Sequence, residues 1–253
     1  MKFSANLGFL FTELRLPDAV RAAHRAGFDA VELHWPYDTS AADLKAALDA
    51  TGLPVLGLNT RRGDVAAGEN GLAALAGREE DARAAIDEAL DYAAIIGTGA
   101  VHVMCGFAKG PTARRVLVSN LSYACTRAAG QGVKILIEPL NHYDAPGYFL
   151  QTTDQAMAIM DDVGADNLAL MFDCYHVQLM EGDVSNRLTR LLPRIGHVQF
   201  ASVPDRGAPD HGELCYAHVF AHLAALGYDA PLGAEYKPAG VTVDSLEWMK
   251  SLP

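Results

Sequence analysis

Four oxygen-bearing side chains stand at the ends of short apolar stretches in the second half of the sequence. They are Glu138 after "KILI", Asp173 after "LALMF", Gln199 in "GHVQF" and Glu235 after "LGA". Each stretch has the length and apolar content of a buried strand. Mg²⁺ and Mn²⁺ prefer oxygen ligands, whereas Zn²⁺ prefers His and Cys. If the strand ends converge, the sequence predicts a site for a divalent metal, Mg²⁺ or Mn²⁺, at these four residues.

The spacing of strands makes such convergence physically reasonable. Adjacent strands lie about 4.8 Å apart, so groups at neighbouring strand ends can meet within a few ångströms. Three carboxylates at that distance raise one another's pKa unless a cation lies between them. Any one of the four residues could instead be an ordinary polar strand end or the N-cap of a following helix. Four consecutive strand ends of this kind favour the metal site.

Apolar stretches alternate with helical patterns along the whole chain. The helical patterns repeatedly end at a Gly, which suits the left-handed residue that closes a helix. Alternating strands and helices predict a parallel sheet. The expected strands lie near residues 2–6, 30–34, 54–59, 100–105, 134–138, 169–173, 196–200 and 232–236.

Eight such units in a chain of 253 residues predict an α/β fold, a (β/α)8 TIM barrel. Residues 1–253 would form one domain, with its site at the C-terminal ends of the strands. A doubly wound open sheet is the alternative that the same alternation allows. Two long Gly-rich stretches, residues 61–77 and 201–213, would lie over the site end of the barrel.

Composition excludes several classes of partner. The formal net charge is −11, whereas nucleic-acid binding requires clustered Lys and Arg. No stretch reaches the roughly 18 apolar residues of a membrane span, and we find no signal-peptide pattern at the N-terminus. The four cysteines show no CxxC spacing, which favours a reduced, cytoplasmic chain. We therefore expect a cytoplasmic protein with no nucleic-acid or membrane partner; a homo-oligomer is compatible with the sequence.

Several motifs together resemble a known family along nearly the whole chain. They include "GFDAVELHWPYD", "IEPLNHYDAPGYFL", "FDCYHVQLMEGD", "RGAPDHGELCY" and "GAEYKP". The chain resembles the hydroxypyruvate isomerases of the xylose isomerase-like TIM barrel superfamily, which also includes 2-oxo-tetronate isomerases and ketose 3-epimerases. The resemblance implies that Glu138, Asp173, Gln199 and Glu235 hold a divalent metal, and that Glu138 and Glu235 are the catalytic acid/base pair.

The implied reaction interconverts hydroxypyruvate and tartronate semialdehyde. A proton moves between adjacent carbons through an enediolate, and a cation stabilises the developing oxyanion. One carboxylate removes the proton and an acid returns it to the neighbouring carbon. The substrate would be a small anionic sugar acid, so an acidic protein needs local cations to hold it.

Three further residues are predicted to contact the substrate. His176 resembles a substrate-contacting His of the superfamily, although it could be a locally bonded residue at a helix start. Arg206 could bind the substrate carboxylate bidentately, or be a solvated loop residue. Lys237 lies two residues after Glu235 and would share its side of a continuing strand, or be exposed at the rim.

Two mouth segments depart from the family pattern. The third strand is followed by "NTRRGD", which places Arg61 and Arg62 where an apolar or Pro pair is more usual. The seventh strand is followed by "ASVPDR" where an Asp-Asn pair would be expected near Ser202 and Val203. Both departures bear on the exact substrate rather than on the class of reaction.

Three other functions compete with this interpretation. One is a related isomerase or epimerase that acts on a 2-oxo-tetronate or a free ketose. Another is a nuclease of the apurinic-site kind, which needs several metals, many His ligands and a basic groove, and which Gln199 and the acidic charge disfavour. The last is a non-catalytic sugar-acid binding barrel, which would have no use for a paired acid and base.

Overall fold

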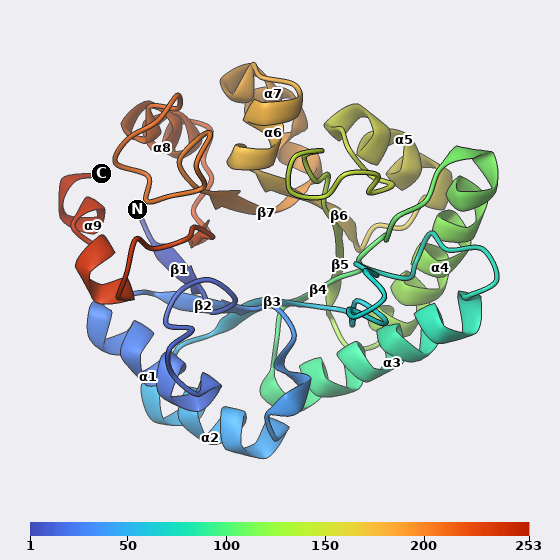
Figure 1. Cartoon of the computed structure of the whole chain (residues 1–253), viewed down its shortest axis with the longest axis horizontal. Coiled ribbons are helices and arrows are strands. Elements are labelled where there is room, and N and C mark those ends of the chain that lie inside the picture. Colours follow the sequence, from blue (N-terminus) through green and yellow to red (C-terminus); the bar gives the residue numbers. More distant parts are fainter. Residues whose placement is uncertain (253) are drawn as a thin grey trace.

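A closed barrel of parallel strands forms the centre of the molecule (Figure 1). The computed structural model describes residues 1–252, and its strands pair in sequence order until β8 closes on β1. The strands are β1 (Phe3–Asn6), β2 (Ala30–Leu33), β3 (Val55–Asn59), β4 (Ala100–His102), β5 (Lys134–Ile137), β6 (Leu168–Asp173), β7 (Ile195–Phe200) and β8 (Leu232–Ala234). The predicted (β/α)8 barrel is confirmed, each expected strand overlaps an observed one, and the open-sheet alternative is wrong.

Helices surround the barrel and cover its outer face (Figure 1). They are α1 (Leu16–Ala26), α2 (Ala41–Thr51), α3 (Glu79–Ile96), α4 (Gly110–Ala129), α5 (Thr153–Val163), α6 (Cys174–Met180), α7 (Val184–Leu191), α8 (Tyr216–Ala225) and α9 (Trp248–Ser251), with short 3₁₀ turns η1 (Pro36–Asp38), η2 (Leu192–Arg194) and η3 (Thr242–Ser245). None of the helices within residues 1–252 combines the length and apolarity needed to cross a bilayer.

Local sequence accounts for these elements. Helix α3 buries Ile86, Leu90 and Ile96 on one face, which is the spacing of an amphipathic helix. It closes at Gly97 with a φ of 74°, in the left-handed region that Gly adopts without strain. In β5, by contrast, Ile135, Leu136 and Ile137 are all buried, as expected for a parallel strand covered on both faces. The period of burial therefore separates helices from strands along the chain.

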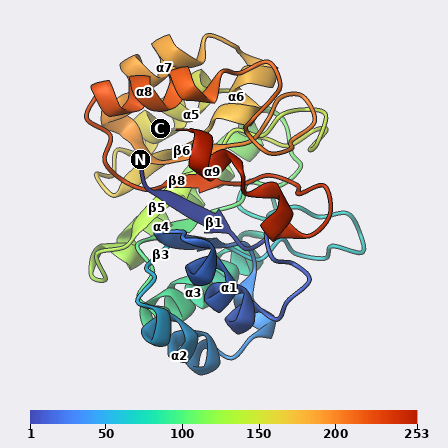
Figure 2. The same ribbon diagram turned by 90° about the vertical axis from the view of Figure 1, so that its left-hand side faces the viewer.

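The last helix, α9, lies beside the first strand (Figure 2). The ring of Trp248 in α9 packs edge-on against Phe3 of β1 and Phe200 of β7, with ring centroids 4.9 and 5.4 Å apart. Trp248 and Phe200 are fully buried. The short α9 thus covers the seam where the barrel closes.

Long loops gather at one end of the barrel (Figure 2). The loop after β3 folds back on itself, and its Gly71 N–H donates a 2.8 Å hydrogen bond to the carbonyl of Arg62. Gly71 also bridges Cys105 after β4. Its φ is 114°, and a Cβ there would lie only 2.6 Å from the Met104 carbonyl oxygen. Only Gly fits this position, which fixes the loop against the barrel mouth.

Candidate active site

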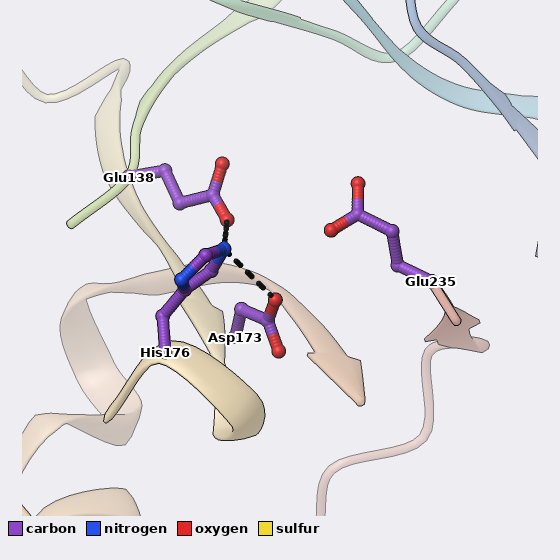
Figure 3. Close-up of side chains that lie close together, drawn as sticks. All are labelled: Glu138, Asp173, His176 and Glu235. Atoms are coloured by element: carbon purple, nitrogen blue, oxygen red, sulfur yellow. Dashed lines mark ion pairs between the residues drawn. The ribbon is translucent and has the colours of Figure 1, made fainter. Parts of the chain in front are cut away.

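Carboxylates from three strand ends meet at the mouth of the barrel (Figure 3). One ligand atom from each of Glu138, Asp173, His176 and Glu235 lies within 4.8 Å of all the others, and all four residues are buried. Glu138 directly follows β5, Asp173 ends β6, and Glu235 directly follows β8. Asp173 is also the N-cap of α6, where its Oδ1 accepts a 2.9 Å bond from the Tyr175 N–H. The strand ends therefore converge as the sequence predicts.

Several oxygens in this region have no hydrogen-bond partner. Oε1 of Glu138, Oδ2 of Asp173 and Oε1 of Gln199 are all buried and unpaired within the described chain. Buried polar atoms are nearly always bonded, and three such oxygens on neighbouring strands call for a missing partner. A divalent cation would supply that partner, because oxygen ligands suit a hard ion. The donor set thus fits a divalent metal.

A hydrogen bond to the buried Glu32 sets the orientation of the Gln199 amide. Its Nε2 donates a 2.8 Å hydrogen bond to Oε2 of Glu32, so the amide oxygen is the atom left free. The strand register places Gln199 directly beside Asp173. Gly233 makes room for the side chains of Glu32 and Gln199, since a Cβ there would lie 2.4 Å from Oε1 of Glu32 and 2.8 Å from Cγ of Gln199. The buried Glu32 thus orients the amide of Gln199 at the level of Asp173.

Arg206 places a fixed positive charge against the acidic cluster. Its Nη2 lies 2.6 Å from Oε2 of Glu235 and 3.9 Å from Oδ2 of Asp173. Its Nη1 lies 3.1 Å from Oδ2 of Asp144. The guanidinium also lies 4.9 Å from the centroid of the Tyr175 ring. Arg206 is buried and adopts a φ of 58°, so the loop after β7 aims it inward. This guanidinium offsets part of the repulsion among the three close carboxylates.

The three carboxyl groups have very different proton affinities. Burial raises the pKa of Glu138 well above its usual value, and the charges of Glu235 and Asp173 raise it further. Burial and Glu235 also raise the pKa of Asp173 to about 7. Burial opposes ionisation of Glu235 too, but the Arg206 charge and the His34 hydrogen bond outweigh it and lower its pKa to about 2. The pKa values of the two neighbouring glutamates therefore differ widely. Glu138 favours its protonated, acidic form and Glu235 its ionised, basic form.

His176 has a defined tautomer. The backbone N–H of Asn141 donates a 3.0 Å hydrogen bond to its Nδ1, so Nδ1 carries no proton. Burial and the charge of Arg206 lower the pKa of His176 to about 3, which keeps the ring neutral. The proton then lies on Nε2, which faces Glu138 and Asp173 at 3.8 and 3.6 Å. A protonated Nε2 is a hydrogen-bond donor rather than a metal ligand, which suits contact with a substrate oxygen.

Histidine and asparagine side chains from the first strands complete the surroundings of Glu235. Nε2 of His34 lies 2.8 Å from its Oε1, and Nδ2 of Asn6 donates to the same oxygen at 2.9 Å. Residues such as Asp144, Tyr175 and Phe9 also contact Arg206. Sequence reasoning did not single out these last three. Only Asp144, inside "NHYDAPGYFL", offered a signal, as a polar residue close after the fifth strand.

A cavity of about 190 Å³ opens onto Glu138 and Glu235. Its lining comes from the loops and strand ends around the mouth and comprises Phe9, His34, Trp35, Asn59, Arg62, Asn70, His102, Met104, Glu138, Leu140, Asp144, Ala145, His176, Arg206 and Glu235. Lys237, which was predicted to contact the substrate, is exposed and does not line this cavity. The structure thus brings Glu138, Glu235, His176 and Arg206 together and leaves Lys237 outside.

Known proteins resemble this chain over nearly its whole length. A family model described as a xylose isomerase-like TIM barrel matches residues 20–252. The chain is 47% identical to a 2-oxo-tetronate isomerase of Cupriavidus necator, over 98% of this chain and 97% of the relative. It is 38% identical to hydroxypyruvate isomerase of Escherichia coli, over 98% of each chain.

A crystal structure from Brucella melitensis, named as a family 2 AP endonuclease, has a TM-score of 0.95 to this fold. That chain is 37% identical, and the match covers 99% of this chain and 98% of the other. The sequence matches extend over nearly the full length, and the barrel carries its carboxylates where the motifs predict them. This chain belongs to the xylose isomerase-like TIM barrel family.

Proposed function

We propose that this protein is an isomerase that interconverts hydroxypyruvate and tartronate semialdehyde. The observation that carries the proposal is the pair Glu138 and Glu235, which open onto one small cavity with their pKa values shifted in opposite directions. Neighbouring titratable groups whose pKa values are shifted in opposite directions commonly act as the acid and the base of an active site. The names of the relatives from Cupriavidus necator and Escherichia coli support the same class of reaction.

Each glutamate has a defined part in the proton transfer. Glu235 is held ionised by Arg206 and His34 and acts as the base that removes a proton from the hydroxyl-bearing carbon of the substrate. Glu138 holds a proton in the buried site and gives it to the adjacent carbon as the enediolate collapses. The proton of the substrate hydroxyl passes to the former carbonyl oxygen, so the new carbonyl and the new hydroxyl form together. Nε2 of His176 donates to a substrate oxygen, which favours the charge that develops there. In the reverse direction the two glutamates exchange parts.

We further propose that Mg²⁺ or Mn²⁺ is held by Glu138, Asp173, Gln199 and Glu235. When bound, the ion supplies electrostatic stabilisation for the enediolate oxygens. Its positive charge also favours the ionised form of Asp173. The three unpaired oxygens of Glu138, Asp173 and Gln199 support this ligand set.

The size of the cavity favours a short substrate. Its volume of about 190 Å³ lies below the roughly 300–1,000 Å³ of pockets for drug-sized ligands. An acid of three or four carbons suits this space better than a hexose. A four-carbon 2-oxo-tetronate is therefore the second candidate, and the 47% identity to a 2-oxo-tetronate isomerase favours it specifically.

A nuclease function is disfavoured in spite of the name of the Brucella melitensis structure. The net charge of −11 would repel a phosphate backbone. Within residues 1–252 there is one cluster of at least three potential metal-binding His, Cys or acidic residues. A site that needs several metals with many His ligands has no counterpart in that part of the chain.

A substrate panel run with and without chelator tests the proposal. Hydroxypyruvate, a 2-oxo-tetronate and a ketose would each be incubated with the enzyme, and the products identified by NMR in D₂O. We expect turnover of a three- or four-carbon acid, with deuterium entering the carbon that receives the proton. No turnover of any substrate, in either metal state, would favour the non-catalytic binding barrel instead.

A further inference from the structure

A carboxylate substrate needs a cation in a cavity that is otherwise acidic. Among residues 1–252, the cavity lining contains two arginines, Arg62 and Arg206, and no lysine. Its three histidines already lie beside carboxylates: His34 is 2.8 Å from Glu235, and His102 and His176 are 3.7 and 3.8 Å from Glu138. Besides the proposed metal ion, the charge that receives the substrate carboxylate therefore comes from one of the arginines.

Arg206 already has anionic partners. Its two terminal nitrogens lie 2.6 Å from Glu235 and 3.1 Å from Asp144. A substrate carboxylate at this guanidinium would have to displace a protein carboxylate, leaving a buried charge uncompensated. Arg206 is thus suited to hold Glu235 ionised, and less suited to bind a second anion.

Arg62 is the cavity arginine whose charge is free. Within residues 1–252 its side chain forms no ion pair, and its guanidinium lies 4.0 Å from the centroid of the Trp35 ring. Stacking on an aromatic face leaves the edge of the guanidinium, with its N–H donors, available to an anion. The adjacent Arg61 differs, because its Nε and Nη2 donate to Glu88 at 2.7 and 3.0 Å and it does not line the cavity.

The backbone holds Arg62 beside a second polar group. The carbonyl of Arg62 accepts the 2.8 Å bond from Gly71, so Asn70 lies next to Arg62 across the folded loop. Asn70 also lines the cavity, and its amide can donate to a carboxylate oxygen. The bridge between Gly71 and Cys105 fixes this part of the loop to the end of β4. The backbone hydrogen bond and the bridge therefore hold the loop segments that carry Arg62 and Asn70 in place.

We propose that Arg62, assisted by Asn70, is the carboxylate receptor that makes this site select oxo acids over neutral sugars. The inference rests on the proposed function and names the part of the site that recognises the substrate. A guanidinium can donate two parallel hydrogen bonds to a carboxylate, which adds orientation to attraction. The carboxylate at the mouth would then place the reacting carbons deeper, towards Glu138 and Glu235.

The kinetic test compares two adjacent arginines. Arg62→Gln keeps most of the side-chain stem and removes the charge, and Arg61→Gln is the matched control. Hydrogen bonds to charged groups contribute about 1.5–3 kcal/mol, so Arg62→Gln should raise KM for hydroxypyruvate about 10- to 100-fold. Its kcat should change much less, Arg62→Lys should recover part of the affinity, and Arg61→Gln should stay within about twofold of wild type. Equal effects of Arg62→Gln and Arg61→Gln would overturn the proposal.

A binding measurement separates this inference from the proposed reaction. D-Glycerate is a three-carbon hydroxy acid without a carbonyl to isomerise, and its binding can be followed by calorimetry on the folded variants. A selective loss of at least about tenfold in glycerate affinity in Arg62→Gln supports the receptor even if no substrate is turned over. In that case the reaction assignment alone fails. If wild type does not bind glycerate, or Arg62→Gln binds it as wild type does, Arg62 is not the receptor.

Discussion

Nη2 of Arg206 lies 2.6 Å from Oε2 of Glu235, and both groups are buried. Arg206 comes from the loop after β7 and Glu235 directly follows β8, so the contact links two segments at the mouth. Its consequence is chemical, because it keeps one glutamate ionised beside another, Glu138, whose pKa is raised. The same contact means that a protein cation and a metal ion would share one group of carboxylates.

Removing that cation should make the fold depend on metal. Arg206→Met keeps an apolar stem but leaves Glu235, Asp173 and Asp144 without their buried partner. Loss of one partner of a buried ion pair costs about 3–5 kcal/mol. We expect a lower melting temperature in chelator and a larger gain on adding Mg²⁺ than in wild type, both measured by thermal unfolding. A melting temperature equal to wild type in both conditions would show that the pair contributes little.

The two glutamates should be needed for proton transfer as well as for ligation. Glu138→Gln and Glu235→Gln each keep one oxygen ligand and remove the basic carboxylate. Loss of a positioned acid/base group typically costs about 10²–10⁴-fold in rate. We expect each variant to lose at least about 10²-fold in kcat at saturating Mn²⁺.

Gln199→Ala is the matched control for the glutamate variants. It removes a neutral ligand without removing a proton-transfer group, so excess Mn²⁺ should largely restore its rate. Metal titrations of kcat for all three variants make the comparison. If excess metal restores both glutamate variants to near wild-type rate, they act in ligation only and the base lies elsewhere.

The loop after β3 should tolerate one Ala substitution much better than another. Gly71→Ala would place a Cβ 2.6 Å from the Met104 carbonyl at a φ of 114°. Gly68→Ala, in the same loop, meets nothing within 4 Å and incurs only the strain of a φ of 85°. Strained backbone costs about 1–3 kcal/mol, and the clash adds to it. We expect Gly71→Ala to have the lower free energy of unfolding and the higher KM, as measured by urea denaturation and steady-state kinetics.

An exposed histidine in the loop after β7 should give a small pH-dependent contribution to stability. Hydrogen bonds that His211 donates to the carboxylates of Asp210 and Asp205 raise its pKa. A folded pKa above the unfolded value means that the contribution is fully present below about pH 6.5 and is lost as pH rises through the raised value. His211→Ala should therefore destabilise the protein more at pH 5.5 than at pH 8.5.

The size of that effect is limited by solvent. An exposed ion pair contributes up to about 1 kcal/mol, so the two melting curves should be compared at low salt. The His211 proton resonances, followed by NMR, provide an independent titration. An effect of His211→Ala that grows as pH rises would contradict the assignment of the charged form to the folded state.

The strands and their polar ends were predictable because their signals are local. An apolar run closed by a single carboxylate identifies both the strand near Glu138 and the group that it positions. Lys237 was harder, since its expected side assumed that alternation continues past Glu235. The structure ends β8 at Ala234, so the alternation of a strand no longer governs Lys237. Its role in substrate binding stays a prediction.

The loops resisted prediction for a different reason. Arg61 and Arg62 are chemically identical neighbours, and only the tertiary contacts with Glu88 and Trp35 separate the paired charge from the free one. The depression of the Glu235 pKa could not be foreseen either, because Arg206 reaches it from another segment through a left-handed backbone. Such long-range arrangements leave no periodic trace in the sequence.

Asn6 of the first strand donates a 2.9 Å hydrogen bond to Glu235, 229 residues later in the chain. The active site therefore spans the seam between β1 and β8, where the barrel closes. Its residues come from both ends of the sequence. During synthesis, six or seven strands could emerge and collapse without assembling a working pair of glutamates. In refolding from denaturant, enzymatic activity should return together with docking of β8 on β1 and never before it. Activity thus reports closure of the barrel in this protein.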